Sequence, residues 1–265
     1  MKVLLVDGYN MLYRARSGWA KGENPIVYTF FRSFRAAVNK FNPDRVYFVL
    51  EGKPVKRLAM MKEYKAQRVY HDKDDFHRQK RMIIKMLKEN FPVHVVRHPY
   101  YECDDVLAAL ATVTHKDDDC IVVSSDSDFY QLLQTHECLA LYNPIRKKFV
   151  PEPQCDYVSW KALRGDSADN IEGFRGIGDK RAALLLEDEE AFHQFLEQDG
   201  NTEKFNRNCE MIRFHDMTND LENIERSDIE YDPQKIKNDF SYLGFKSIIN
   251  DNFWTKFVQT FESLT

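Results

Sequence analysis

The sequence reads "VHVVRHPYYECDDVLAALATVTH" from Val93 to His115, the pattern of a buried strand, an acidic turn and a helix. Val93–Arg97 is an apolar run of strand length, and Asp104–His115 has the composition of a helix. The acids of "ECDD", Glu102–Asp105, stand between them and bring like charges to the edge of an apolar core. The same order of strand, acid and helix recurs along the first part of the chain.

Further apolar runs predict the other strands of a sheet. These runs are Lys2–Asp7, Arg45–Leu50, Cys120–Ser125 and, more weakly, Cys138–Tyr142. Helical patterns over Pro25–Phe41 and Phe76–Phe91 lie between them. Strands that alternate with helices of this length predict a mostly parallel sheet covered on both faces. After about Pro153 the strand pattern fades, so we expect an α/β domain over residues 1–153 and a helical domain over residues 154–265.

Composition limits the classes of protein to which the chain can belong. Its 265 residues suffice for one large or two modest domains, and no apolar run is long enough for a signal peptide or a membrane span. The five cysteines are scattered and form no C-x-x-C pair, which predicts reduced thiols in a cytoplasm and neither a zinc site nor a disulfide framework. The net charge of -4, taken alone, argues against a nucleic-acid partner. From Lys53 to Lys88, however, Lys and Arg outnumber Asp and Glu by twelve to four, which predicts a cationic arm on an acidic body.

Acidic residues follow each of the main predicted strands. They are Asp7, Glu51, Glu102, Asp104, Asp105, Asp126 and Asp128. Because the carboxyl ends of parallel strands meet at one edge of a sheet, we expect these side chains to converge. Any one of them, such as Asp7 or Asp105, is also explained by a helix N-cap. Together they would repel one another and raise each other's pKa unless cations are bound.

Hard divalent cations fit this set of oxygen ligands. The absence of clustered His or Cys among them favours Mg²⁺ or Mn²⁺ over zinc. Two such ions, about 3.5–4 Å apart, activate water and stabilise the leaving oxygen of a phosphodiester. The acids at this edge therefore indicate phosphodiester chemistry.

A second acidic group precedes a glycine-rich turn in "GDSADNIEGFRGIGDKRAALLL", Gly165–Leu186. Asp166 and Asp169 belong to this group, although "DSADN" alone is also typical of a polar loop. The turn matches neither a nucleotide P-loop nor a dinucleotide fingerprint. Its backbone N–H groups at a helix start, with Lys180 and Arg181 beside them, suit a phosphate. A packing corner between two helices is the alternative interpretation.

The motif "EYKAQR" in the cationic arm carries Tyr64, Lys65 and Arg68. Their spacings of three and four residues predict that they share one face of a helix. Charged runs of this kind are also typical of solvated surfaces. The aromatic residues Tyr64, Tyr70 and Phe76 are interleaved with the charges, and we expect single-stranded nucleic acid to stack on them.

Five motifs follow one another along the chain: "LLVDGYNMLYR", "EYKAQR", "ECDD", "SSDSDFYQLL" and "GDSADNIEGFRGIGDKRAALLL". In order and spacing they resemble the 5'-nuclease or flap endonuclease family, most closely the stand-alone phage 5'-3' exonucleases and the 5'-3' exonuclease domain of bacterial DNA polymerase I. The resemblance covers about residues 1–187. It implies an α/β fold with a PIN-like nuclease domain over residues 1–153, including a helical arch at about 53–88. It also implies a helix-three-turn-helix element at about 156–187 within a DNA-binding domain over 154–265.

The resemblance implies a role for each motif residue. The first of two Mg²⁺ or Mn²⁺ ions would be held by Asp7, Glu51, Glu102, Asp104 and Asp105. The second would be held by Asp126, Asp128 and Asp169, with Asp166 nearby. Lys65 would stabilise charge on the scissile phosphate, with Arg68 and Arg14 in support. DNA would be contacted by Tyr64, Gly176, Gly178, Lys180 and Arg181, and a K⁺ ion would bind at the helix-three-turn-helix.

Two residues depart from the family pattern. Glu51 stands where Asp is usual, so this ligand is one methylene longer and the spacing or preference of the metal is expected to differ. Cys103 replaces a small residue, usually Ala, between the acids, and we expect this change to alter packing only.

The motifs together predict a divalent-metal-dependent, structure-specific 5'-nuclease of DNA replication or repair. We expect it to hydrolyse branched or 5'-flap DNA near junctions of single and double strands, and to remove RNA primers from RNA-DNA hybrids. It would act as a monomer, with a polymerase or single-strand-binding protein in trans and no membrane partner, in the cytoplasm of a bacterial cell or a phage-infected host. A non-catalytic junction-binding protein and a PIN-type ribonuclease are the alternatives.

Overall fold

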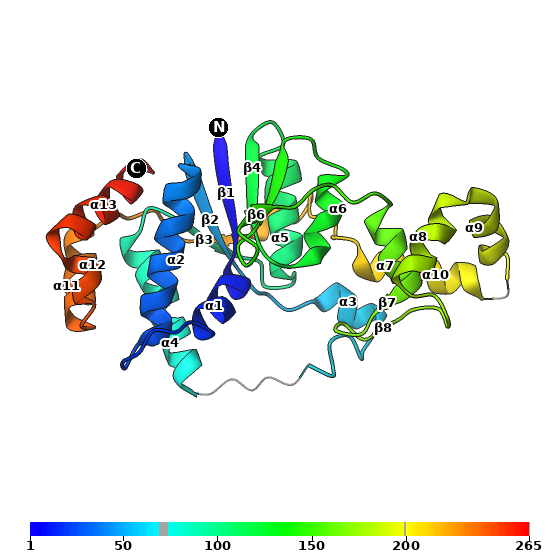
Figure 1. Cartoon of the computed structure of the whole chain (residues 1–265), viewed down its shortest axis with the longest axis horizontal. Helices are drawn as coiled ribbons and strands as arrows, with labels where there is room; N and C mark the ends of the chain where they lie inside the picture. The colour runs from blue at the N-terminus through cyan, green and yellow to red at the C-terminus, as the bar shows by residue number, and fades with distance from the viewer. Residues whose placement is uncertain (69–73, 199, 265) are drawn as a thin grey trace.

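The structure of the chain, a computed structural model, describes residues 1–68, 74–198 and 200–264 (Figure 1). Within these residues the main sheet has seven strands in the order β6-β5-β4-β1-β2-β3-β9. Its central strands run parallel: β1 Lys2–Asp7, β2 Arg45–Leu50, β3 His94–Arg97, β4 Asp119–Val123 and β5 Leu139–Asn143. The predicted α/β fold with a mostly parallel central sheet is therefore confirmed.

Two short strands close the edges of this sheet. β6, Lys148–Phe149, pairs antiparallel with β5, and β9, Glu225–Arg226, pairs antiparallel with β3. β9 lies in the part of the chain where the sequence predicted helices only, and that prediction is wrong for these residues. A strand of two residues has no alternation of apolar and polar side chains, so periodicity could not reveal it.

Helices cover both faces of the sheet. One face carries α1 Gly8–Arg16, α2 Pro25–Phe41 and α4 Asp74–Asn90, and the other carries α5 Cys103–Ala109 and α6 Tyr130–Leu133. A π-helical turn, Leu110–Thr114, extends α5, and a 3₁₀ turn, Ser127–Phe129, precedes α6. Along β1, Leu4 and Val6 enter the first core whereas Val3 and Leu5 enter the second, as the two-residue period of a strand requires. Among the described helices, none has the length and apolar character needed to cross a membrane.

The sequence of α2 explains its bounds and its place. Pro25 stands in the first turn, where the N–H that proline lacks has no partner within the helix. Phe30, Phe31 and Phe34 are fully buried on the face toward the sheet. Asn42 ends the helix with a left-handed φ of 43°.

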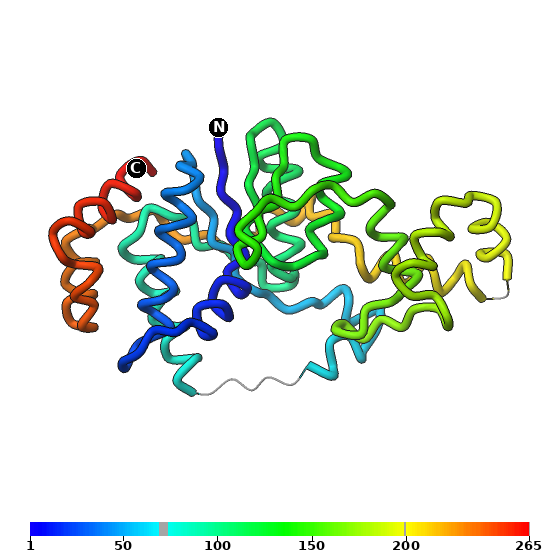
Figure 2. Tube along the Cα trace, in the orientation of Figure 1, coloured from blue at the N-terminus to red at the C-terminus, as the bar shows by residue number. Residues whose placement is uncertain are grey.

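The helices after residue 153 lie in two places. The α7–α10 unit consists of α7 Tyr157–Arg164, α8 Asp179–Glu187, α9 Glu189–Leu196 and α10 Asn201–Ile212, beside the small hairpin of β7 Gly165–Asp166 and β8 Ile171–Glu172. Its core also includes Tyr64 of the predicted arch. The chain then passes through a 3₁₀ turn, Leu221–Asn223, and β9 to the opposite end of the molecule (Figure 2). There α11 Pro233–Tyr242, α12 Lys246–Ile249 and α13 Asp251–Glu262 join the core of α2. The sequence predicted one helical domain over 154–265, whereas the structure divides these helices between two cores.

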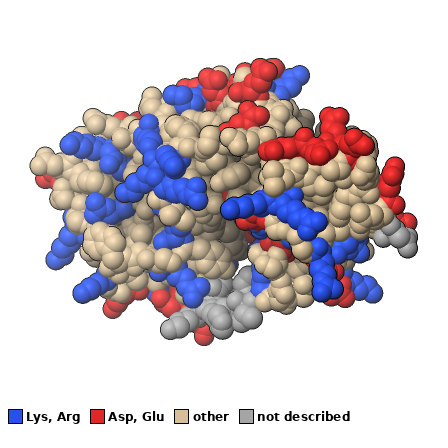
Figure 3. Space-filling view, turned by 45° about the vertical axis from the view of Figure 1, so that its right-hand side comes forward, with Lys and Arg blue, Asp and Glu red and all other residues tan. Residues whose placement is uncertain are grey.

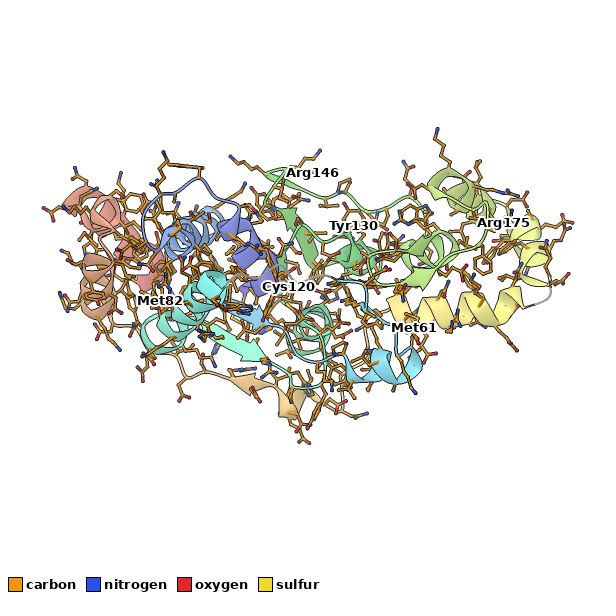
Figure 4. All side chains as sticks on the ribbon, turned by 90° about the horizontal axis from the view of Figure 1, so that it is seen from below. Met61, Met82, Cys120, Tyr130, Arg146 and Arg175 are labelled. Carbon is orange, nitrogen blue, oxygen red and sulfur yellow. The ribbon has the colours of Figure 1, made fainter. Side chains whose placement is uncertain are left out.

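The segment predicted to be an arch connects the two ends of the molecule. It contains α3 Val55–Met60, turns over residues 62–67, and most of α4. Residues 69–73 of the predicted arch, among them Tyr70, lie outside the described residues. Met61, just after α3, and Met82, on α4, lie on opposite sides of Cys120 in the central sheet (Figure 4).

Two glycines let the acidic strand ends approach their neighbours. A Cβ atom on Gly8 would lie 2.3 Å from the carbonyl oxygen of Val49, and a Cβ atom on Gly52 would lie 1.9 Å from that of His98. Each glycine directly follows a predicted metal ligand. The absence of a side chain at Gly8 therefore allows β1 to lie close to β2. The absence of one at Gly52 allows the end of β2 to lie close to the loop that leads to the "ECDD" motif.

Gly52→Ala is expected to lower the free energy of unfolding by roughly 3 kcal/mol, because the new methyl group meets fixed backbone atoms. Gly178→Ala is the matched control. A Cβ atom there meets nothing within 4 Å, so only the weak preference for glycine at this N-cap is lost, less than about 1 kcal/mol. Urea unfolding measures both variants, and equal midpoints for the two would contradict the close approach at Gly52.

Candidate active site

A cavity of about 930 Å³ opens beside the carboxyl ends of β1, β2 and β4. Its lining includes an acid from each main strand end: Asp7, Glu51, Glu102, Asp104 and Asp126. Lys65, Arg68, Arg14 and Tyr64 line the same cavity. Figure 3 shows one face of the molecule, with a hollow near its centre and Lys and Arg side chains on either side of it.

Three acids of this cavity, Asp7, Glu51 and Asp104, are poorly compensated by positive charge. Burial raises the pKa of Asp7 to about 6, with a further contribution from the charge of Asp126. Burial also raises the pKa of Glu51 to about 7, helped by the charges of Glu102 and Asp7. The pKa of Asp104 is well above its ordinary value, first because of burial and then because of Asp126, Asp7 and Glu51. Each of these carboxylates disfavours the ionisation of the next, which is the electrostatic condition that a bound cation relieves.

Asp7 is both a helix cap and a lining residue of the cavity. Its Oδ1 accepts a hydrogen bond from the backbone N–H of Asn10 at 2.9 Å, which caps α1. Its Oδ2 accepts a hydrogen bond from the hydroxyl of Ser124 at 2.7 Å. The two interpretations of this residue are therefore compatible, and Ser124 is a neighbour that the sequence analysis did not single out.

Asp128, Asp166 and Asp169 form a second acidic group. One carboxylate oxygen from each lies within 4.8 Å of the others. Asp128 follows β4, whereas Asp166 and Asp169 come from the hairpin of the α7–α10 unit. Asp128 and Asp169 line a small pocket together with Glu102 and Asp104 of the first group. The hairpin thus carries its acids to the edge of the sheet.

Lys65 joins the two acidic groups. Its Nζ atom contacts Glu102 and lies 3.8 Å from Asp169. The prediction that Tyr64, Lys65 and Arg68 share a helical face is wrong, because this segment forms turns and Lys65 has a left-handed φ of 56°. A lysine in that conformation is unfavourable, so the surrounding contacts hold it there. Arg68 also reaches Asp169, which it contacts through Nη2.

Tyr64 is an internal residue of the site. It is 5% exposed, and its hydroxyl hydrogen-bonds to Glu102 at 3.0 Å and to Asp169 at 3.2 Å. Phe76 is 2% exposed and stacks on Tyr13. The expectation that bases stack on Tyr64 and Phe76 is therefore wrong for the described arrangement, because both rings are already covered. Tyr70 lies outside the described residues.

Arg57 is the main residue that the sequence analysis missed. Its guanidinium, 4% exposed, binds both oxygens of Asp105 at 2.6 and 2.9 Å and Glu102 at 2.7 Å. It also donates to the backbone carbonyls of Met211 and Arg213, each at 2.9 Å. Arg57 thus connects α3, the start of α5 and the end of α10. In the sequence it is one of many cations in the arm, and no local pattern distinguishes it.

Asp105 is oriented by these contacts. It is fully buried, and besides Arg57 it accepts the backbone N–H of His215 at 2.9 Å. It also completes a capping box with Glu102 at the start of α5. Asp105 does not contribute to the lining of the acidic cavity, unlike the other acids of its motif.

The glycine-rich turn lies apart from the acidic cavity. Gly176 has a left-handed φ of 77°, and Gly178 stands at the N-cap of α8. Lys180 and Arg181 follow it, and all four residues are exposed. Arg181 donates to the carbonyl of Gly176 at 3.4 Å. Arg14, in contrast, lies in the cavity wall, where it donates to the carbonyl of Pro144 at 3.3 Å.

Comparison with known sequences identifies a family. Residues 2–156 match the family model described as "5'-3' exonuclease, N-terminal resolvase-like domain". DNA polymerase I of Chloroflexus aurantiacus is 30% identical over 220 residues, which cover 74% of this chain and 23% of the polymerase. The thermostable DNA polymerase I of Thermus thermophilus is 36% identical over 203 residues, which cover 70% of this chain and 24% of the polymerase. The chain therefore matches about a quarter of the length of these relatives.

Two further comparisons cover more of the partner molecule. The 5'-3' exonuclease of Mycoplasmopsis pulmonis is 27% identical over 198 residues, which cover 70% of this chain and 66% of that protein. The T5 D15 protein co-crystallised with metal ions has a TM-score of 0.64 at 19% identity, over 98% of this chain and 99% of that one. At this identity the structural match establishes a shared fold.

Arg57→Met is expected to lower the free energy of unfolding by about 3–5 kcal/mol, because it leaves the buried carboxylate of Asp105 without its cation and leaves Glu102 with Lys65 alone. Arg146→Met, at an exposed arginine, is the control and is expected to change stability by less than about 0.5 kcal/mol. Chemical denaturation measures both. If the Arg57→Met protein were as stable as the control, the contacts of Arg57 with Asp105 and Glu102 would contribute nothing to the free energy of unfolding.

Divalent metal is expected to stabilise the protein more at high pH than at low pH. Asp7 and Glu51 have pKa values of about 6 and about 7 in the folded protein, above their ordinary 3.8 and 4.5. Between about pH 4 and 7 the folded state therefore binds more protons than the unfolded state, and stability in EDTA falls as the pH rises. Ions bind the ionised carboxylates, so excess Mg²⁺ should raise the melting temperature more at about pH 8 than at about pH 5.5. Thermal melts at the two pH values test this, and equal increments would contradict it.

Proposed function

The chain belongs to the 5'-3' exonuclease family defined by its N-terminal resolvase-like domain, and we propose on this basis that it is a divalent-metal-dependent, structure-specific 5'-nuclease. The observation that carries the proposal is the convergence of acids from four strand ends in one cavity, where burial and neighbouring acids raise the pKa values of Asp7, Glu51 and Asp104. Such a set stays ionised only beside cations, and its donors are all carboxylate oxygens. The family predicted from the five motifs is confirmed by the match over residues 2–156.

The acids divide into ligands for two ions, Mg²⁺ or Mn²⁺. We assign Asp7, Glu51, Asp104 and Asp126 to the first ion, and Asp128 and Asp169, with Asp166, to the second. This revises the predicted sets in two places: Asp126 moves from the second ion to the first because it lines the same cavity, and Glu102 leaves the first set because it contacts Arg57 and Lys65. Glu102 borders both groups through Lys65 and Tyr64. When bound, the ions would supply an activated water and stabilise the leaving oxygen of the phosphodiester. The predicted role of Asp105 as a ligand is replaced by a positioning role, because both of its oxygens are held by Arg57.

The cations of the cavity bind and orient the substrate. Lys65 and Arg68 contact carboxylates in the free protein, so an incoming phosphate would exchange these contacts for its own. Lys65 then stabilises negative charge that develops on the scissile phosphate. Arg14, in the cavity wall, holds a neighbouring phosphate.

The α7–α10 unit is proposed to grip the duplex. We assign the helix-three-turn-helix to residues 156–187, which contain α7, the glycine-rich turn and α8. The exposed N–H groups near Gly176 and Gly178, with Lys180 and Arg181, suit the phosphate backbone. Three features stay predictions: the K⁺ ion at this turn, the arch at about 53–88 and the domain boundary near residue 153.

Branched and 5'-flap DNA are the proposed substrates. A structural relative, the T5 D15 flap endonuclease, was crystallised in a complex with DNA and metal ions, and it shares the fold over 99% of this chain with a TM-score of 0.66. We also propose that the protein removes RNA primers and acts on RNA-DNA hybrids in replication or repair. It would do so as a monomer in the cytoplasm, with a polymerase or single-strand-binding protein in trans.

Asp126→Asn is expected to reduce cleavage of a 5'-flap duplex in Mg²⁺ by at least about 10–100-fold, because it removes a charged ligand from the first group. DNA binding, measured by fluorescence anisotropy in Ca²⁺, should be retained. Asp117→Asn, at an exposed aspartate away from the cavity, is the matched control and should cleave normally.

The alternatives give different outcomes in the same assay. A folded wild-type protein that binds the flap and cleaves in neither Mg²⁺ nor Mn²⁺ would be a junction-binding protein. Cleavage of an RNA flap without cleavage of the matched DNA flap would identify a ribonuclease. Either result would defeat the proposed function.

A further inference from the structure

Lys161 lies inside the second acidic group. It belongs to α7 and is 5% exposed. Its Nζ atom contacts Asp128 and lies 2.6 Å from Asp166. These are two of the three residues whose carboxylate oxygens lie within 4.8 Å of one another. The ammonium group therefore stands among the oxygens proposed to hold the second ion.

The surroundings of Lys161 fix its position. Ala162 and Leu163 of the same helix are fully buried in the core of the α7–α10 unit. One turn earlier on α7, the Tyr157 hydroxyl hydrogen-bonds to Asp128 at 3.2 Å and to Ser127 at 2.9 Å. Lys161 is therefore held in place by a packed helix. Arg68, in contrast, belongs to the predicted arch, and its side chain is 40% exposed.

The second group is already compensated by protein cations. Asp128 and Asp166 pair with Lys161, and Asp169 pairs with Arg68 and lies 3.8 Å from Lys65. Burial raises the pKa of Asp166, but Lys161 outweighs it and the pKa is lowered. Burial still raises the pKa of Asp128, against the opposing effect of Lys161. In the first group, by contrast, no lysine or arginine of the described residues forms an ion pair with Asp7, Glu51 or Asp104, and the pairs in this region go to Glu102 and Asp105.

We propose that Lys161 is a built-in counter-ion of the Asp128, Asp166 and Asp169 group, and that a divalent ion binds there only by displacing its ammonium group. The inference rests on the proposed metal sites and adds a difference between them. The four acids assigned to the first ion form no ion pair with a lysine or arginine in the described structure, although Lys65 contacts Glu102 beside them, so the binding of the first ion relieves repulsion. The second ion must break the two ion pairs that the buried Lys161 makes with the partly exposed Asp128 and Asp166, so its affinity is lower.

Titration with Mn²⁺ followed by electron paramagnetic resonance counts the bound ions without any reaction. The wild-type protein is expected to bind a first ion tightly and a second at least about tenfold more weakly. Lys161→Met removes the charge, and Lys161→Gln removes it while keeping a polar group, so that one neutral variant serves if the other fails to fold. In both, the second ion should bind at least about tenfold more tightly than in the wild type.

Two variants separate charge from packing. Lys161→Arg keeps the positive charge and should keep the weak second site. Lys204→Met removes a lysine of the same unit that donates to the carbonyl of Gly173 at 2.7 Å and pairs with the exposed Glu172 at 3.4 Å, outside the second acidic group, and should also behave as the wild type. A tighter second site in Lys161→Arg or Lys204→Met would attribute the effect to packing and overturn the proposal.

The outcomes for this inference and for the proposed function can be told apart. A wild-type protein that binds two ions equally well, or neutral Lys161 variants with an unchanged second site, would overturn the role of Lys161. If the same protein binds the first ion and cleaves a 5'-flap, the proposed function stands. A folded protein that binds no Mn²⁺ at all would overturn both.

Discussion

Repulsion among carboxylates gathered at one edge of a sheet is the constraint on which the rest of this structure depends. The parallel order of β4, β1, β2 and β3 brings the chain to that edge four times, and each time it leaves at least one acid there. Glycines remove the side chains that would hold these strand ends apart. In a buried setting such an arrangement raises the free energy of the ionised protein, unless positive charges are delivered to it.

The protein delivers those charges from segments far away in the sequence. Arg57 comes from α3, Lys65 and Arg68 from the turns that follow it, and Lys161 from α7. The same contacts attach the α7–α10 unit to the sheet, because Arg57 also binds the carbonyls of Met211 and Arg213 at the end of α10. The acidic site and the attachment of the α7–α10 unit therefore depend on the same interactions, because both require buried acids to pair with cations that are distant in the sequence.

The two acidic groups differ in how completely they are compensated. The first keeps carboxylates with raised pKa values in a cavity, which is the repulsion that the proposed hard cation would relieve. The second is closed by Lys161 and Arg68 in the free protein. Under the proposed function, the two ions would therefore bind with different affinities.

The sequence by itself determined the parallel sheet, its central strands, the set of acids at the strand ends and the family, because apolar periodicity and motif spacing are local properties. Only the tertiary structure decided which acids face the cavity and which are neutralised. It turned Asp105 to Arg57, buried Tyr64 against Glu102, broke the expected helix at Lys65 and placed Lys161 among the acids of the second group. It also added β9 to the sheet and sent the last three helices to the core of α2. Most of these features depend on contacts between residues 33 to 225 positions apart, from Lys161 with Asp128 to Arg35 with Thr260, and a pattern read along the chain has no signal for them.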